Sequence, residues 1–260
     1  IELTNNNWPN KGEIEFTNLK LKYRDDLPFV LKGLNCVINP GSRVGIVGRT
    51  GAGKSSIMVC LFRLFEPEGS IKIDNIETTK AMGLFDLRSN LAIIPQDPIL
   101  FSGTLRFNLD PFNKYNDNDI INALKKVYLW NEYFSTKNEK LNYIISENGS
   151  NLSSGQKQLI CIARVLLKKP KLLLLDEATA SIDYQSDLLI QKSIKNSFDK
   201  NTTILTIAHR LQTIIDSDKI MVLDKGRIIE YDTPNNLLNK NINDPKAIFA
   251  HLYNEMNVKS

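Results

Sequence analysis

Apolar and polar residues alternate over residues 13–23, which is the period of a strand with one buried face. Short apolar runs of strand length follow at residues 43–47, 70–73, 91–94, 171–175, 203–207 and 219–223. Apolar residues at helical spacing predict helices over residues 56–64, 118–127, 153–167 and 188–198. Because several of the strands alternate with helical stretches, the pattern predicts an α/β domain with a mainly parallel sheet.

The strand pattern lapses between about residues 96 and 168, where the sequence is typical of helices and irregular segments. We therefore expect one core formed by residues 1–95 and 169–260, with a helical subdomain inserted over residues 96–168.

Composition narrows the class of protein. The chain has 260 residues, 42% hydrophobic and 24% charged, and a net charge of +4, which calls for neither nucleic acid nor an anionic membrane as partner. No apolar run reaches the roughly 18 residues that a membrane-spanning helix needs. Each of the three cysteines, Cys36, Cys60 and Cys161, lies in an apolar run, which favours small buried side chains and a reducing compartment. The chain begins at Ile1 with no secretory signal, and we expect a piece of a longer protein.

A glycine-rich loop carries the first chemical signal. Residues 48–55 read GRTGAGKS and fit the pattern GxxxxGK[ST] between an apolar strand and a helix. Glycines let backbone N–H groups curve around phosphate oxygens, and a helix that begins at Lys54 adds about half a positive charge. Lys54 is expected to reach the β- and γ-phosphates, and the Ser55 hydroxyl to ligate Mg²⁺. Kinases, GTPases, helicases and transport ATPases all use such a loop, so a second element is needed.

Two acids supply that second element. Asp176 and Glu177 follow an apolar strand, which places carboxylates at the carboxyl edge of a parallel sheet. Asp176 is expected to hold Mg²⁺ through a water molecule, and Glu177 to orient or deprotonate the attacking water.

Residues 151–159 read NLSSGQKQL and open a helix, where Ser153 and backbone N–H groups form an anion site that the chain's own phosphate loop does not need. This string resembles the signature motif of ATP-binding-cassette proteins, in which the signature closes over an ATP held by a second cassette. The order of motifs resembles that family over nearly the whole chain. The resemblance implies a P-loop NTPase core with a mainly parallel sheet, an antiparallel β subdomain and an inserted helical subdomain.

Four further positions carry over from the family one by one. Gln96, in IPQD, resembles the glutamine that contacts Mg²⁺ and the attacking water. Asp183, in ASID, resembles the aspartate that signals across the cassette dimer. His209, in IAHR, resembles the switch histidine that contacts the γ-phosphate, and Tyr23 resembles the aromatic residue that stacks on adenine.

The resemblance therefore implies ATP and Mg²⁺ as cofactors and three sets of site residues. The catalytic set is Glu177, His209 and Gln96, and the Mg²⁺ ligands are Ser55, Gln96 and Asp176. The ATP-binding set is Tyr23, Gly48, Arg49, Thr50, Gly51, Ala52, Gly53, Lys54, Ser55, Ser56, Gln96, Asp176, Ser153, Gly155 and Gln156.

Two segments, residues 23–31 and 101–111, are similar to the second nucleotide-binding domain of the multidrug-resistance-associated (C) subfamily of exporters. One departure is Ser154, which stands where the wider family usually has glycine. In the C subfamily this half of the signature serves the degenerate nucleotide site, whereas Glu177 and His209 are intact. The resemblance therefore implies that this domain gives its catalytic machinery to the competent site.

The leading hypothesis is a motor domain that drives export of organic anions or conjugates, at the cytoplasmic face of a membrane. Its expected partners are a second cassette of the same polypeptide and the transmembrane domains of the transporter, with no nucleic acid. A regulatory cassette that gates a channel and a soluble non-transport ATPase of the family remain alternatives. A chromosome or DNA-repair ATPase is disfavoured, because the stretch between Gln96 and Leu152 is short and has no heptads.

Overall fold

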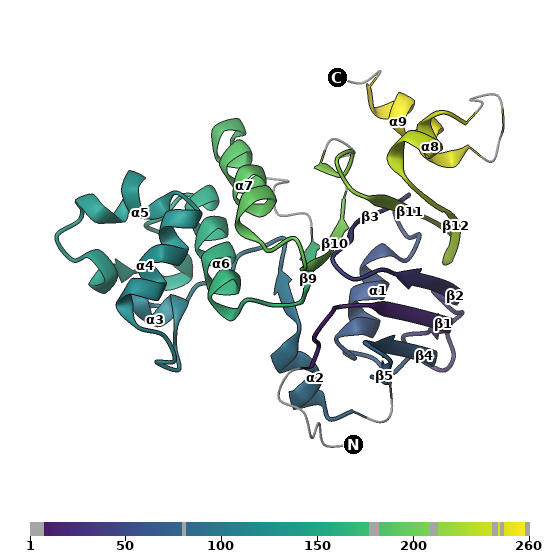
Figure 1. Cartoon of the computed structure of the whole chain (residues 1–260), viewed down its shortest axis with the longest axis horizontal. Helices are drawn as coiled ribbons and strands as arrows, with labels where there is room; N and C mark the ends of the chain where they lie inside the picture. Colours follow the sequence, from purple (N-terminus) through teal and green to yellow (C-terminus); the bar gives the residue numbers. More distant parts are fainter. Residues whose placement is uncertain are drawn as a thin grey trace. The chain divides into compact units, whose positions relative to one another are not determined.

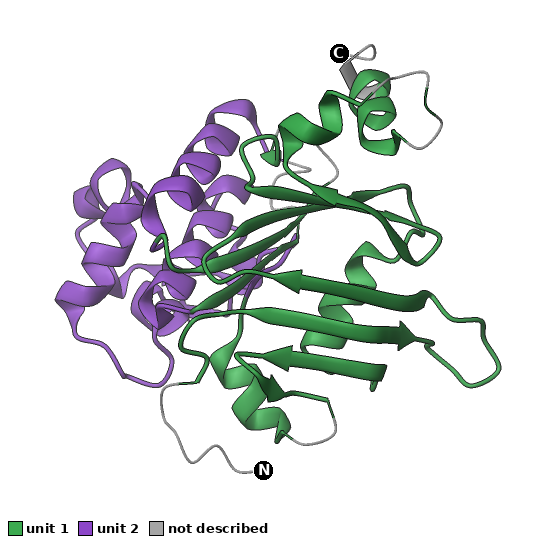
Figure 2. Cartoon of the chain, turned by 45° about the vertical axis from the view of Figure 1, so that its right-hand side comes forward, with its two compact units in different colours: residues 1–92, 171–176, 200–260 green, residues 93–170, 177–199 purple. Residues whose placement is uncertain are grey.

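The computed structural model describes residues 8–79, 82–176, 182–208, 213–240, 244 and 247–257. The chain divides into two compact units (Figure 2): residues 1–92, 171–176 and 200–260 form unit 1, and residues 93–170 and 177–199 form unit 2. The domain boundaries expected from the sequence, 1–95 and 169–260 around 96–168, stay a prediction.

An antiparallel sheet in unit 1 has the strand order β2-β1-β4-β5. Its strands are β1 (Ile14–Leu21), β2 (Leu31–Ile38), β4 (Glu68–Ile73) and β5 (Ile76–Glu77). Ile14 and Phe16 of β1 are buried at alternate positions, and a register shift after Phe16 moves the buried face on to Leu19 and Leu21. One buried face is what the alternation near the start of the chain predicts.

The second sheet has the order β12-β11-β3-β10-β9-β6. Figure 1 labels all of these strands except β6. Its strands are β3 (Arg43–Gly48), β6 (Ala92–Ile94), β9 (Leu172–Asp176), β10 (Thr203–Ile207), β11 (Lys219–Asp224) and β12 (Arg227–Asp232). The pairings β11–β3, β3–β10 and β10–β9 are parallel, and β12 runs antiparallel to β11. The α/β fold with a mainly parallel sheet and an antiparallel β sheet is confirmed.

Apolar side chains cover both faces of the parallel strands. Ile46 and Met221 lie in one buried cluster with Ile57 of helix α1, whereas the next residues in sequence, Val47 and Val222, lie in a second cluster. This explains why the strands are continuous apolar runs. The helices of unit 1 are α1 (Lys54–Leu61), α2 (Leu84–Asn90), α8 (Pro234–Leu238) and α9 (Ile248–Asn257).

Unit 2 is mainly helical. It contains α3 (Leu105–Leu109), α4 (Asp117–Lys126), α5 (Leu129–Glu132), α6 (Ser154–Lys168) and α7 (Tyr184–Ser197), and a pair of two-residue strands, β7 (Gly103–Thr104) and β8 (Ile144–Ile145). Single 3₁₀ turns lie at Phe134–Thr136, Lys140–Asn142 and Glu147–Gly149. Helix α6 packs against both α4 and α7, and these three are the helices of unit 2 that the apolar spacing predicts.

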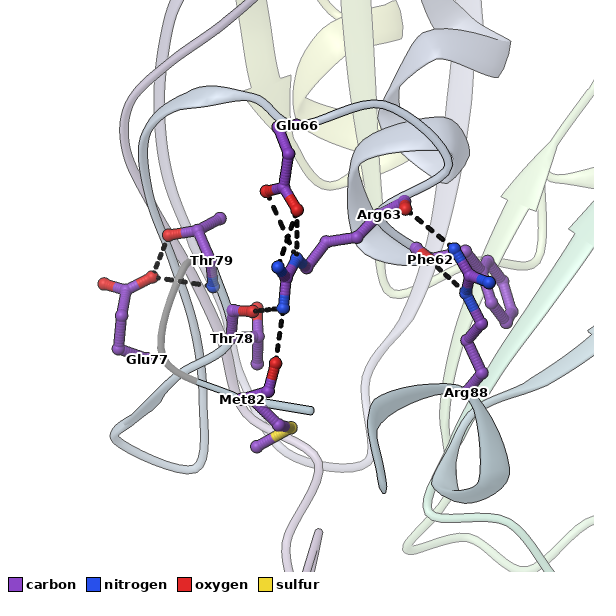
Figure 3. A network of polar contacts seen from close by, with 8 residues as sticks. All are labelled: Phe62, Arg63, Glu66, Glu77, Thr78, Thr79, Met82 and Arg88. Atoms are coloured by element: carbon purple, nitrogen blue, oxygen red, sulfur yellow. Dashed lines mark hydrogen bonds and ion pairs between the residues drawn. The ribbon is translucent and has the colours of Figure 1, made fainter. Parts of the chain in front are cut away.

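Two arginines fix the end of α1 that lies away from the glycine-rich loop (Figure 3). The Arg63 guanidinium donates to the carbonyls of Thr78 and Met82 and pairs with Glu66, with 2.6 Å between Nη2 and Oε1. The guanidinium of Arg88 donates to the carbonyls of Phe62 and Arg63, 3.0 and 2.8 Å away. Carbonyls at a helix C-terminus have no partner within the helix, and the Arg88 donors satisfy two of them, while Arg63 joins this end of α1 to the segment that contains Thr78 and Met82.

Arg63→Ala should lower the free energy of unfolding by about 1–3 kcal/mol, because Thr78 is buried and its carbonyl then loses a charged donor. Arg88→Ala is the matched control. Arg88 is exposed, water can replace it, and we expect a loss of about 1 kcal/mol or less. Urea unfolding measures both, and equal losses would contradict the special role of Arg63.

Candidate functional site

The glycine-rich loop connects the end of β3 to the start of α1, as the sequence predicts. Gly53 caps the helix in a left-handed conformation with φ 103°, so α1 begins at Lys54. The Lys54 side chain folds back over the loop, and its Nζ donates to the carbonyls of Gly48 and Arg49 at 2.8 and 3.2 Å. The ammonium group therefore lies against the loop backbone, and Lys54 is only 7% exposed.

The loop fits a phosphate group. Arg49, Thr50, Gly51 and Ser55 are exposed, and in the described part of the chain no side chain caps α1. The N–H groups of the first helical turn carry a partial positive charge and need acceptors, which phosphate oxygens can supply. The Ser55 hydroxyl lies in the same turn, where it can serve a metal ion bound to the phosphate.

The register of the parallel sheet places Asp176 at the same edge as this loop. Ile207 of β10 pairs with Asp176 of β9 on one side and with Ile46 of β3 on the other. All three strands end at this edge, and β3 runs directly into the loop. The predicted catalytic residues Glu177 and His209 lie outside the described residues, although Asp176 and Ala208, the residues before them, belong to this edge.

Tyr23 lies between β1 and β2 and is tied to α1. Its hydroxyl hydrogen-bonds to the Ser56 hydroxyl at 2.9 Å, and its ring packs edge-on against Phe65 with 5.0 Å between centroids. A hollow of about 200 Å³ beside Tyr23 is lined mainly by charged side chains, among them Lys22 and Glu66. The structure therefore joins the predicted base platform to the predicted phosphate site through Ser56.

One residue that the sequence analysis missed supports the glycine-rich loop through backbone hydrogen bonds. Gly226, in the turn between β11 and β12, donates its N–H to the Ala52 carbonyl at 3.0 Å, and its own carbonyl accepts from Lys32 at 2.8 Å. A Cβ on Gly226 would lie 2.0 Å from the Val30 carbonyl oxygen. The only sequence signal is the turn string DKG between two apolar strands, which does not reveal what the turn touches.

The remaining predicted residues lie in unit 2. Ser153 and Gln156 form a capping box at the start of α6: the Ser153 hydroxyl accepts from the Gln156 N–H, and the Gln156 side chain accepts from the Ser153 N–H. Gln96 is exposed in the loop after β6, and the preceding carbonyl, of Pro95, accepts from the buried side chain of Gln158 at 3.0 Å. Asp183 caps α7.

The three cysteines are free thiols and take no part in this site. Burial raises the pKa of Cys60 to about 12 and that of Cys36 to about 11, so both are protonated near neutral pH.

A parallel sheet, a phosphate-binding loop between strand and helix, and an acid at the same sheet edge define a P-loop nucleoside triphosphatase. The helical unit 2 adds a second feature to this class: its helix α6 begins in the motif of residues 151–159 and is capped there by Ser153 and Gln156.

Comparison with known proteins identifies the family. The model of the family "ABC transporter" matches residues 31–180. ABC transporter C family member 12 of Dictyostelium discoideum is 60% identical over 89% of this chain, and ATP-binding cassette sub-family C member 2 of Mus musculus is 54% identical over 89%. The solved structure of a bacterial Atm1-family ABC exporter with ATP bound matches with a TM-score of 0.81 at 36% identity, covering 89% of this chain and 40% of that one.

The chain belongs to the ABC transporter family, and its relatives place it with the C subfamily, as the sequence motifs predict. It spans only 17% and 15% of the length of the two relatives. The roles of the individual site residues stay predictions.

Tyr23→Ala should weaken ATP binding about 5- to 150-fold, because stacking of a base on an aromatic ring is worth roughly 1–3 kcal/mol. Tyr23→Phe is the matched control: it keeps the ring and loses only the hydrogen bond to Ser56, so we expect a change of about fivefold or less. Titration with ATP under non-hydrolysing conditions measures both. An unchanged affinity in Tyr23→Ala would refute the base platform.

Proposed function

We propose that this chain is the ATP-binding and ATP-hydrolysing motor cassette of an ABC exporter, and that it works as a pair with a second cassette. One observation carries the proposal: unit 1 has a complete phosphate loop at a helix N-terminus, and unit 2 has a second exposed helix start, at Ser153 and Ser154. One nucleotide needs one phosphate loop, so the signature turn is supplied to an ATP that another cassette holds.

In this proposal the residues of unit 1 hold the nucleotide. Tyr23 stacks on the base, the N–H groups of residues 48–56 and the Lys54 ammonium bind the phosphates, and Ser55 and Asp176 hold the metal. Mg²⁺, when bound, neutralises charge on the phosphate oxygens. Gln96 contacts the metal and the attacking water, Glu177 orients or deprotonates that water, and His209 binds the γ-phosphate.

The signature turn of unit 2 is suited to an incoming anion. The Ser153 hydroxyl accepts a hydrogen bond from the Gln156 N–H, and an accepting hydroxyl still has a proton of its own to donate. The capping box fixes the orientation of that hydroxyl before any ligand arrives. A rigid donor loses less conformational freedom on binding, which favours recognition of the phosphate across the cassette dimer.

The membrane partner is proposed on two grounds. The relatives carry ABC transporter names and are about five to six times as long as this chain. Ile99, Phe101, Phe107 and Phe112, around α3, are 45–78% exposed, which suits a surface that packs against another domain. In the described residues no helix is long and apolar enough to span a bilayer. We place the cassette at the cytoplasmic face, under transmembrane domains that export organic anions or conjugates.

The proposed domain organisation follows the sequence: a nucleotide-binding core with its β subdomain over residues 1–95 and 169–260, and a helical signature subdomain over residues 96–168. The second cassette belongs to the same polypeptide in this scheme.

Glu177→Gln should keep ATP affinity and lower hydrolysis about 10²- to 10⁴-fold, because a general base acts only in the transition state. The ATP-bound pair of cassettes should then accumulate, since the separating step is blocked. Nucleotide binding and single-turnover hydrolysis, measured on the same preparation of the full-length protein, test this.

Lys54→Ala is the matched variant, because it should weaken ATP binding itself. If Glu177→Gln cleaves ATP at a near wild-type rate, Glu177 is not the base, and this cassette is the regulatory member of its pair.

A further inference from the structure

The signature turn, which is the first turn of α6 with its cap (Ser153 to Gln156), is in direct contact with the first turn of α7. Gly155 is buried, and a Cβ built on it would lie 2.4 Å from the Cβ of Ser186 and 2.5 Å from its Oγ. Cβ atoms essentially never lie closer than about 3 Å to atoms of a residue distant in sequence, so a side chain at 155 forces the first turns of α6 and α7 to shift. The third nearest atom is Cγ2 of Ile182, at 3.7 Å.

Ile182 and Ser186 lie on either side of Asp183, the residue that caps α7. The Ser186 N–H donates to Asp183 Oδ1 at 3.0 Å. Hydrogen bonding from Ser186 lowers the pKa of Asp183, because it stabilises the charged carboxylate. Gly155 is therefore seated against the turn that holds Asp183 in its orientation.

Both sides of this contact are fixed locally. The capping box of Ser153 and Gln156 sets the first turn of α6, and the cap by Asp183 sets the first turn of α7. Further along, α6 and α7 remain packed together, and Ile190 and Ser193 of α7 are fully buried. Two rigid turns in direct contact can move only as one body.

We infer that Ser186 is a positioning residue: through its contact with Gly155 it locks the signature turn and the Asp183 turn into one rigid element. The inference rests on the proposed function, in which the signature turn serves an ATP held by the second cassette, and on the predicted role of Asp183 in signalling across the cassette dimer. Docking of the partner then presents the signature anion site and Asp183 in a fixed relation. Gly155 is glycine because of the close approach of Ser186, in addition to any need of the nucleotide.

The experiment uses a rescue. The variants Gly155→Ala, Ser186→Ala, Ser186→Gly and the double variants Gly155→Ala/Ser186→Ala and Gly155→Ala/Ser186→Gly are made in the full-length protein. Ser186→Gly removes the obstructing Cβ, whereas Ser186→Ala keeps it and is the matched control. The kcat and KM of ATP hydrolysis, the Kd for ATP and the urea midpoint are measured for each.

Gly155→Ala should lower kcat by about 10²-fold, because a misplacement of about 1 Å can cost that much even far from the reacting atoms. ATP binding by the chain's own phosphate loop should stay within about twofold. The phosphate loop that holds the protein's own ATP lies in the other unit, so this split separates positioning from a general loss of fold. Adding Ser186→Gly should restore most of kcat and the urea midpoint, and adding Ser186→Ala should restore neither.

Two results would overturn the inference: a Gly155→Ala variant as active as wild type, or a Gly155→Ala/Ser186→Gly variant as impaired as Gly155→Ala alone. If wild type does not hydrolyse ATP, the proposed function fails instead. The urea midpoints then still decide the contact, since the rescue by Ser186→Gly and not by Ser186→Ala must appear there.

Discussion

The structure depends on one constraint: a loop that presents backbone N–H groups to phosphate has almost no side chains with which to hold itself in shape. Apart from the Lys54 ammonium, which donates to the carbonyls of Gly48 and Arg49, its support comes from neighbouring backbone at very short range. Gly226 supplies this support, with its N–H on the Ala52 carbonyl and its α-carbon against Val30, where no side chain would fit. The same contacts connect the glycine-rich loop to β2, the strand that follows the Tyr23 loop. The base platform and the phosphate site are therefore held by the same backbone contacts.

The rest of unit 1 holds β3 and α1, the elements on either side of the glycine-rich loop, in place. The parallel sheet is apolar on both faces, so β3 cannot shift without disturbing the buried clusters that contain Ile46 and Val47. The far end of α1 is held by two arginines: Arg88 donates to the carbonyls of Phe62 and Arg63, just after the helix, and Arg63 donates to the carbonyls of Thr78 and Met82. Unit 1 therefore fixes both ends of α1, the helix whose N-terminus follows the glycine-rich loop.

Much of the fold could be predicted from the sequence, because the spacing of apolar residues along the chain indicates strands and helices. The apolar runs give β3, β9, β10 and β11 to within a residue or two, and the helical spacing gives α4 and α6. The sequence pattern did not predict strand β2, because Gly33 and Asn35 interrupt its alternation of apolar and polar residues. The pairing of β1 with β2 is also irregular in register. The short helices α2, α3 and α8 have too few turns to show a period. Gly226 and Ser186 could not be found in this way, because their roles depend on contacts with segments far away in the sequence.

The contrast between Ser154 and Gly155 shows what a motif can and cannot tell. Both positions belong to the signature, and at 154 the family that the motif resembles usually has glycine. Ser154 is exposed at the first turn of α6, where a side chain meets no neighbour that the fold requires, and serine is a better helix former than glycine. Gly155 is buried against Ser186, where a methyl group does not fit. The departure at 154 therefore costs this fold nothing, and any consequence it has must be felt by a ligand or by the second cassette.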